Sequence, residues 1–266
     1  MPTVEKTPRR KIMTLTPEEQ RRRYDFEYSQ AFTLAAASGS ASQAQIKTEA
    51  DSYFVCTTMM ADATAPFMAR MRDDGSGQIW QSDFVSSLNC FGTRERPNLM
   101  VSPILIPPMS SIVFDLQNYS LAGNTGEIVL GGYKLFSADF KWDPQQKLDT
   151  WFQYVASKAV AAGGIDTITM RLQADAHFQV EKLLARKAGL PATGQFSARI
   201  SDSDTGKSWT DRSVRRDNQF GTAQYPGILP WPKLLRPNIV VTVEVTNLTA
   251  LPNNIEVVVE GTKRYI

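Results

Sequence analysis

The sequence predicts an all-β protein of two tandem antiparallel β-sandwiches, of jelly-roll or Greek-key type, preceded by an extended N-terminal arm. Three observations lead to this prediction. The second half of the chain repeats the first, apolar residues alternate with the period of strands, and prolines and tight-turn residues punctuate the chain at short intervals. Signals for helices are scarce.

The internal duplication is long and keeps its order. From Thr64 and Thr193 onward, an offset of 129 positions holds to the end of the chain. Upstream the offset is 124 for residues 50–61, and further back it is 126. A repeat of this length predicts that both halves share one fold. Aromatic residues recur at matched positions. Trp80 and Trp209 each follow an acidic turn, and Phe91 and Phe220 each lie within N-x-F-G-T. Near the start of each unit, Phe26-x-Tyr28 matches Phe152-x-Tyr154.

The repeat also predicts the boundaries of the parts. We expect a basic arm at 1–23, a first sandwich at 24–136, a connector at 137–147 and a second sandwich at 148–266. Residues 150–162 are rich in Ala, Lys and Val and could be taken for a helix. Because they align with the start of the first sandwich, we expect a strand there instead.

The elements within each unit follow from local patterns. Residues 45–50 and 169–174 alternate as strands do, and the β-branched runs 239–245 and 255–261 predict a closing antiparallel hairpin. The acidic stretches at 73–77 and 202–206 predict tight turns, since Asp and Gly accept the backbone angles that such turns need. The prolines predict one long connection per unit that stays out of the sheets; they are Pro103, Pro107, Pro108, Pro226, Pro230, Pro232 and Pro237.

Jelly roll is the preferred topology for each sandwich. An immunoglobulin-like sandwich is the alternative, although the Cys, Trp and Cys spacing of that fold is absent. The two cysteines, Cys56 and Cys90, are expected to be reduced and mostly buried.

The arm carries the charge of the chain. Residues 1–23 hold seven basic and three acidic side chains, while the whole chain has a net charge of only +2. Thr16 and Pro17 predict the start of one short helix through Arg23. A segment of this composition cannot order itself, so we expect a neighbouring subunit or nucleic acid to hold it. The expected contact residues are Arg9, Arg10, Lys11, Arg21, Arg22 and Arg23.

No pattern predicts catalysis, a cofactor or a metal. The sole histidine, His177, aligns with Tyr53, which indicates a half-buried structural ring, and no nucleophile motif or phosphate-binding loop occurs. A calcium site in the acidic turns is a weaker alternative, because the full EF-hand pattern is missing. We therefore expect a protein that is not an enzyme.

Three tryptophans have competing interpretations. Trp80 and Trp209 are expected to be buried structural anchors together with Phe91 and Phe220, but they are also candidate sugar-stacking platforms. Trp231 aligns with Ser102 and is thus special to the second unit, which makes it a candidate contact with a partner.

Both units carry A-D-x-x-F, D-x-x-x-G-x-x-W, N-x-F-G-T followed by Pro, and a closing strand with G-x-K. In these features the repeat resembles the single and tandem β-sandwich virion proteins of tailed bacteriophages. The resemblance implies a non-enzymatic particle component at the capsid surface, vertex, collar or tail. Tandem jelly rolls also resemble the double-barrel major capsid proteins of tailless viruses, which form pseudo-hexagonal trimers.

The expected partners are therefore copies of this chain and other virion proteins, with nucleic acid as a further partner of the arm. A glycan-binding or receptor-binding tail module remains the alternative from another functional class. No apolar run reaches the length of a membrane span, and the N-terminus has no apolar signal core. We expect synthesis in the host cytoplasm and a final location in the virion.

Overall fold

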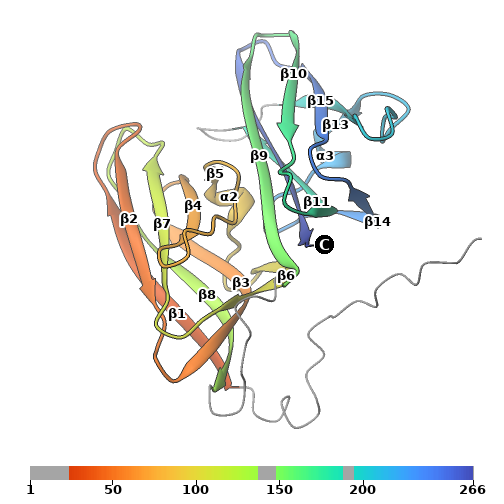
Figure 1. Ribbon diagram of the computed structural model, residues 1–266. Coiled ribbons are helices and arrows are strands. Elements are labelled where there is room, and N and C mark those ends of the chain that lie inside the picture. The colour runs from red at the N-terminus through yellow and green to blue at the C-terminus, as the bar shows by residue number, and fades with distance from the viewer. Residues whose placement is uncertain (1–23, 137–147, 188–194, 266) are drawn as a thin grey trace, which may run out of the picture.

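The computed structural model describes residues 24–136, 148–187 and 195–265. Within these residues, sixteen strands fall into two sets of eight, each with one four-residue helix, and Figure 1 shows how the two sets are arranged. The first set comprises β1 (Tyr24–Leu34), β2 (Ala41–Lys47), β3 (Ser52–Ala63), β4 (Phe67–Asp73), β5 (Val85–Ser86), α2 (Ser87–Cys90), β6 (Asn98–Ile106), β7 (Ser111–Asn118) and β8 (Asn124–Phe136).

The second set repeats the first in the same order. It comprises β9 (Thr150–Val160), β10 (Ile165–Arg171), β11 (His177–Lys187), β12 (Phe196–Asp202), β13 (Val214–Arg215), α3 (Arg216–Gln219), β14 (Gly227–Leu235), β15 (Val240–Asn247) and β16 (Asn253–Arg264). The strand β9 confirms the interpretation of this Ala-rich segment as extended rather than helical.

Each set forms two four-stranded antiparallel sheets. The strand orders are β1-β8-β3-β6 and β2-β7-β4-β5 in the first set, and β9-β16-β11-β14 and β10-β15-β12-β13 in the second. Adding eight to every strand number converts the first pair of sheets into the second. Eight strands in this order make a jelly roll, so the preferred topology is confirmed and the immunoglobulin-like alternative is wrong. We call the two sets the first and the second jelly roll.

Alternating burial explains the strands. In β2 and β10 every second residue faces inward: Ala44 and Ile46 are buried in the first jelly roll, and Ile168 and Met170 in the second. Both predicted acidic turns are present. The amide of the last glycine donates to the first Asp carbonyl, at 2.9 Å for Gly77 and 3.0 Å for Gly206.

The Gly-x-Lys motif has a structural cause in both units. A Cβ at Gly261 would lie 2.0 Å from the Gln179 carbonyl oxygen, beside a register shift in β11, and Gly132 faces the same obstacle in β3. Two residues later, the buried Lys263 ammonium lies 4.2 Å from the centre of the Phe152 ring and pairs with Asp175 at 2.8 Å. Lys134 occupies the equivalent place in the first jelly roll, 3.6 Å from the ring of Phe26.

Two details differ from the sequence-based expectations. The last two strands form no hairpin: β15 pairs with β10 and β12, while β16 pairs with β9 and β11 in the opposite sheet. β15 buries alternate residues, whereas β16 is buried at almost every position because its outer face meets the first jelly roll. Neither pattern specifies the partner strand. Pro103, Pro230 and Pro232 lie within β6 and β14 rather than in long connections. Both strands are sheet edges, where the missing N–H of proline is tolerated.

Candidate assembly interface

The two jelly rolls share a buried contact. The outer face of the β9-β16-β11 sheet packs against residues 80–99 of the first jelly roll, which we call the 80–99 segment. Four apolar residues of the second jelly roll belong to the core cluster of the first: Trp151, Val155, Leu184 and Val258. The indole of Trp151 is fully buried there. A contact that completes a core is a rigid one.

The backbones also pair across the contact. The Gln153 amide donates to the Trp80 carbonyl at 3.0 Å, and the Ser82 amide donates to the Gln153 carbonyl at 2.9 Å. The Val155 amide donates to the Ser82 hydroxyl at 2.8 Å. These bonds fix the position of β9 along the first jelly roll, because each one requires a specific register.

Buried amide side chains extend the network inward. The Gln81 side-chain nitrogen donates to the Gln153 side-chain oxygen at 3.0 Å. The Gln153 side-chain nitrogen donates in turn to a Glu260 carboxylate oxygen at 2.9 Å and to the Asn89 carbonyl at 3.1 Å. Both glutamines are fully buried. An amide in such a site needs its partners, so rotation of one jelly roll against the other would leave polar groups unsatisfied.

An ion pair lies at the centre of this contact. Lys182 Nζ is 2.8 Å from Glu260 Oε1, with the two side chains 7% and 0% exposed. Although both residues come from the second jelly roll, the ammonium also donates to Asn98 Oδ1 of the first at 3.2 Å and to the Leu99 carbonyl at 2.5 Å. The first jelly roll therefore supplies part of the solvation that the buried lysine needs.

A second buried carboxylate bridges the units without a cation in hydrogen-bond contact. Glu256 accepts from the Ser86 amide at 3.1 Å and from the Asn89 side-chain nitrogen at 2.8 Å. The hydrogen bonds from Asn89 and Ser86 favour the charged carboxylate and lower its pKa, but burial has the larger effect and raises the pKa of the Glu256 carboxyl to about 7. Burial also raises the pKa of the neighbouring Cys90 thiol, which is unpaired like Cys56.

The predicted aromatic anchors lie at equivalent places with different surroundings. Trp80 is 3% exposed, and its Nε1 has no hydrogen-bond partner among the described residues. Trp209 is only half-buried, and its Nε1 donates to Asp202 at 2.7 Å while Lys233 lies 4.8 Å from the ring centre. Repeat position 233 corresponds to 104, where the first jelly roll has an isoleucine. Phe91 and Phe220 are both buried.

Trp231 lies on β14, an edge strand of the second jelly roll, and is 87% exposed. Ile228 and Leu234 on the same strand, and Tyr225 just before it, are exposed as well. Large apolar side chains gathered on one edge are typical of contact surfaces. The predicted contact residues of the arm, Arg9 to Arg23, lie outside the described residues, as does the predicted arm helix.

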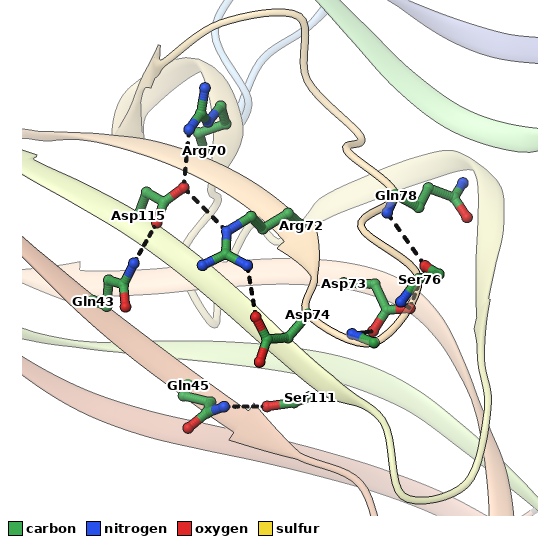
Figure 2. Close-up of polar contacts among 11 residues, drawn as sticks. Gln43, Gln45, Arg70, Arg72, Asp73, Asp74, Ser76, Gln78, Ser111 and Asp115 are labelled. Atoms are coloured by element: carbon green, nitrogen blue, oxygen red, sulfur yellow. Dashed lines mark hydrogen bonds and ion pairs between the residues drawn. The ribbon is translucent and has the colours of Figure 1, made fainter.

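The acidic turns use their carboxylates internally. Asp73 accepts from the amides of Gly75 and Ser76, at 3.3 and 3.1 Å, and Figure 2 shows it turned toward its own turn. Figure 2 also shows Asp115 held by arginines of the adjacent strand, with Arg70 at 3.2 Å and Arg72 at 3.4 Å. Among the described residues no group of three or more His, Cys, Asp or Glu side chains is placed to hold a metal ion.

His177 is half-buried at the start of β11, as its alignment with the half-buried Tyr53 predicts. Within the described ranges, no helix is long and apolar enough to cross a membrane.

The sequence analysis missed the interface residues Gln153, Lys182, Glu256 and Glu260. A signal for two of them, Gln153 and Glu260, was present in the repeat. Positions 151, 153 and 155 hold Trp, Gln and Val, whereas their counterparts 25, 27 and 29 hold Asp, Glu and Ser. Glu260 likewise corresponds to Gly131. Such differences at matched strand positions mark a face that is covered in one unit and open in the other.

No family model matches this sequence, and a comparison with curated proteins gave no match. Among solved structures, the chain is similar to the major capsid protein P2 of bacteriophage PM2, with 11% identity and a TM-score of 0.41 over 91% of this chain and 98% of that chain. It is also similar to the N-terminal CBM22-1–CBM22-2 tandem domain of Xyn10C from Paenibacillus barcinonensis, with 12% identity and a TM-score of 0.18 over 88% and 93% of the two chains. A structure of the infectious bursal disease virus Gx strain follows, with 9% identity and a TM-score of 0.16 over 92% and 82%. Identities and TM-scores at this level carry no argument about what this chain does.

Proposed function

We propose that this chain is a non-enzymatic structural protein of a virus particle and that its two jelly rolls act as one rigid building block. The observation that carries the proposal is the buried polar contact between the jelly rolls. It fixes their relative orientation through Gln153, Glu256 and the Lys182–Glu260 pair. A fixed orientation is what a subunit needs if its outer surfaces are to meet identical neighbours in a regular array.

The buried ionisable groups support a structural role over catalysis. A catalytic acid or base must reach a substrate in a cleft. Glu256 and Glu260 are fully buried and Lys182 nearly so, and all three bond to groups of the contact itself. The two carboxylates have no access to solvent, and the Lys182 ammonium is bonded to Glu260, Asn98 and Leu99.

The glycan-binding alternative finds little support in the tryptophans. A sugar platform needs an exposed ring face beside polar groups. Trp80 is buried, and one face of the half-buried Trp209 is occupied by Lys233.

Two jelly rolls standing side by side favour a capsid protein of the double-barrel class over a collar or tail component. In this proposal, copies of the chain meet through sandwich surfaces and the arm, whose basic residues Arg9 to Lys11 and Arg21 to Arg23 contact neighbouring subunits. The exposed edge around Trp231 is the described surface most in need of such a neighbour.

Self-association of the full-length chain tests the proposal. Purified protein is examined by sedimentation velocity over a range of concentrations and by negative-stain electron microscopy. We expect oligomers of defined size that join into sheets or shells at high concentration. A chain that remains monomeric at every concentration and salt condition would refute a role in assembly.

A further inference from the structure

We infer that a cavity beside Trp80 in the first jelly roll binds an alkylammonium group, the charged end of a small aliphatic amine or of a lysine side chain. The cavity has a volume of about 430 Å³, and Thr150 at the start of β9 also lines it. The inference goes beyond the proposed function and does not depend on it. The second jelly roll supplies the template, because a lysine of the chain itself holds the equivalent place there.

The template is a group of three side chains in the second jelly roll. Lys233 Nζ lies 2.9 Å from Asp202 Oδ2 and 4.8 Å from the centre of the Trp209 ring. The Trp209 Nε1 donates to the same carboxylate oxygen at 2.7 Å. The buried Asp202 is thus compensated by one ammonium and one indole N–H. An ammonium near an aromatic ring is further attracted by the electrons of the ring.

The first jelly roll keeps two members of this group and lacks the third. Asp73 and Trp80 stand at the matched positions of the aspartate and the tryptophan, whereas Ile104 stands in place of Lys233. Isoleucine is shorter than lysine and carries no charge, so the chain itself places no ammonium there. Ile104, Asp73 and Trp80 all line the cavity. The cavity therefore lies where the template has its ammonium.

The two retained polar groups lack the partners that their counterparts have. Trp80 is 3% exposed, and its Nε1 has no hydrogen-bond partner among the described residues. The buried Asp73 accepts from Gly75 and Ser76 of its own turn, and no described lysine or arginine pairs with it. Burying a carboxylate without a cation, or an N–H without an acceptor, is costly. A bound ammonium would compensate Asp73 as Lys233 compensates its counterpart.

The charge of the cavity walls favours a cation. The described residues that line the cavity include three aspartates and no lysine, arginine or histidine. Asp175 pairs with Lys263 at 2.8 Å, and Asp149 lies 4.0 Å from Arg264, so residues that do not line the cavity partly neutralise these two. Asp73 is the aspartate of the cavity that a ligand would neutralise.

The chemistry of the walls favours an organic cation over a metal ion. Most lining residues are apolar or aromatic, among them Pro103, Leu105 and Pro107 beside Tyr53 and Tyr265. In the part of the chain that the structure describes, no three carboxylate, His or Cys side chains are placed to hold a metal ion together. Apolar walls suit the methylene chain of an alkylamine, and a volume of about 430 Å³ is typical of small-molecule sites.

Isothermal titration calorimetry on the full-length chain tests the inference. Cadaverine presents the ammonium as a free amine, whereas Nα-acetyl-lysinamide presents it as a protein side chain. Whichever of the two binds more tightly identifies the source of the group. We expect one amine to bind per chain. Pentanol lacks the charge and calcium chloride lacks the alkyl chain, so neither should displace the amine.

Variants of the lining residues locate the site. Asp73→Asn removes the charge and should weaken amine binding roughly tenfold or more. Ile104→Lys copies the template, supplies an ammonium from the chain itself and should abolish binding. Gln78→Lys adds an ammonium at an exposed lining position and should weaken binding, and it decides the matter where either of the buried variants does not fold. Asp62→Asn removes an exposed carboxylate of β3 that does not line the cavity and is the matched control. Circular dichroism confirms that each variant is folded.

The outcomes are distinct. Binding of either amine that is weakened in Asp73→Asn and kept in Asp62→Asn supports the inference. A wild-type chain that binds neither amine would overturn it. Binding that ignores both Asp73→Asn and Gln78→Lys, or displacement of the amine by calcium or pentanol at equal concentration, would overturn it as well. None of these results bears on self-association, so the proposed function is tested separately.

Discussion

The ion pair between Lys182 and Glu260 offers the sharpest test of the internal contact. Replacing Lys182 with Met keeps most of the side-chain volume and removes the ammonium. Glu260 would then remain fully buried, with Gln153 as its hydrogen-bond donor and no cation at 2.8 Å. Breaking a buried pair by removing one partner costs about 3–5 kcal/mol, because the other charge stays buried and uncompensated. We expect a loss of that size in the free energy of unfolding.

Two variants calibrate this loss. Lys158→Met removes a surface pair with Asp166 at 2.6 Å, whose side chains are 45% and 35% exposed, and should cost less than about 1 kcal/mol. The double variant Lys182→Met with Glu260→Gln removes both charges and should recover part of the stability lost in the single variant.

Urea denaturation followed by tryptophan fluorescence measures these changes. Trp80 and Trp151 lie in the first core, so their emission reports on separation of the jelly rolls as well as on unfolding. If Lys182→Met costs no more than Lys158→Met, the buried pair does not stabilise the contact and the reasoning is wrong.

Three further predictions follow. Because the Glu256 pKa is raised from 4.5 to about 7, the folded protein binds this proton more tightly than the unfolded chain. The free energy of unfolding should therefore fall by about 3 kcal/mol between pH 4.5 and 7. In the Glu256→Gln variant, urea titrations at a series of pH values should no longer show this part of the fall. Gly261→Ala should cost about 1–3 kcal/mol because its Cβ meets the Gln179 carbonyl. Gly75→Ala, whose Cβ would meet only Asp73 Oδ1 at an ordinary contact distance of 3.8 Å, should be near neutral in thermal melts. Deleting residues 1–23 should leave the circular dichroism spectrum of the sandwiches intact and reduce assembly seen by electron microscopy; unchanged assembly would show that the arm is dispensable.

The duplication made the fold accessible from sequence. Core positions recur at a fixed offset because both jelly rolls must fill the same interior, as Phe91 and Phe220 show. The repeat also corrected a misleading local pattern, since residues 150–162 are rich in Ala, Lys and Val, yet residues 150–160 form the strand β9. The pairing of the last two strands was not accessible in this way. The β-branched runs show that β15 and β16 are strands, but not that the two strands lie in opposite sheets.

The interface was hidden for a different reason. Glu127 and Glu256 are the same residue at matched positions, yet one is exposed and the other fully buried. Local sequence sets which side of a strand a residue occupies, whereas burial of the outer side depends on what docks there. Trp80 and Trp209 illustrate the same point. Trp80 lies in the cluster that the second jelly roll completes and is buried, whereas Trp209 at the matched position is only half-buried.

The outer face of the β9-β16-β11 sheet is covered, whereas the matched face of the β1-β8-β3 sheet is exposed at Asp25, Glu27 and Glu127, and this contrast has a physical reason. The internal contact is covered as soon as the chain folds, so its face can hold Trp151 and Val155 and a buried Glu256 whose partners arrive with the fold. A surface that meets another copy must stay soluble beforehand, and large apolar patches on a free subunit promote aggregation. The charged residues Asp25, Glu27 and Glu127, on the exposed outer face of β1 and β8, fit that requirement. They keep this face hydrated in the free subunit.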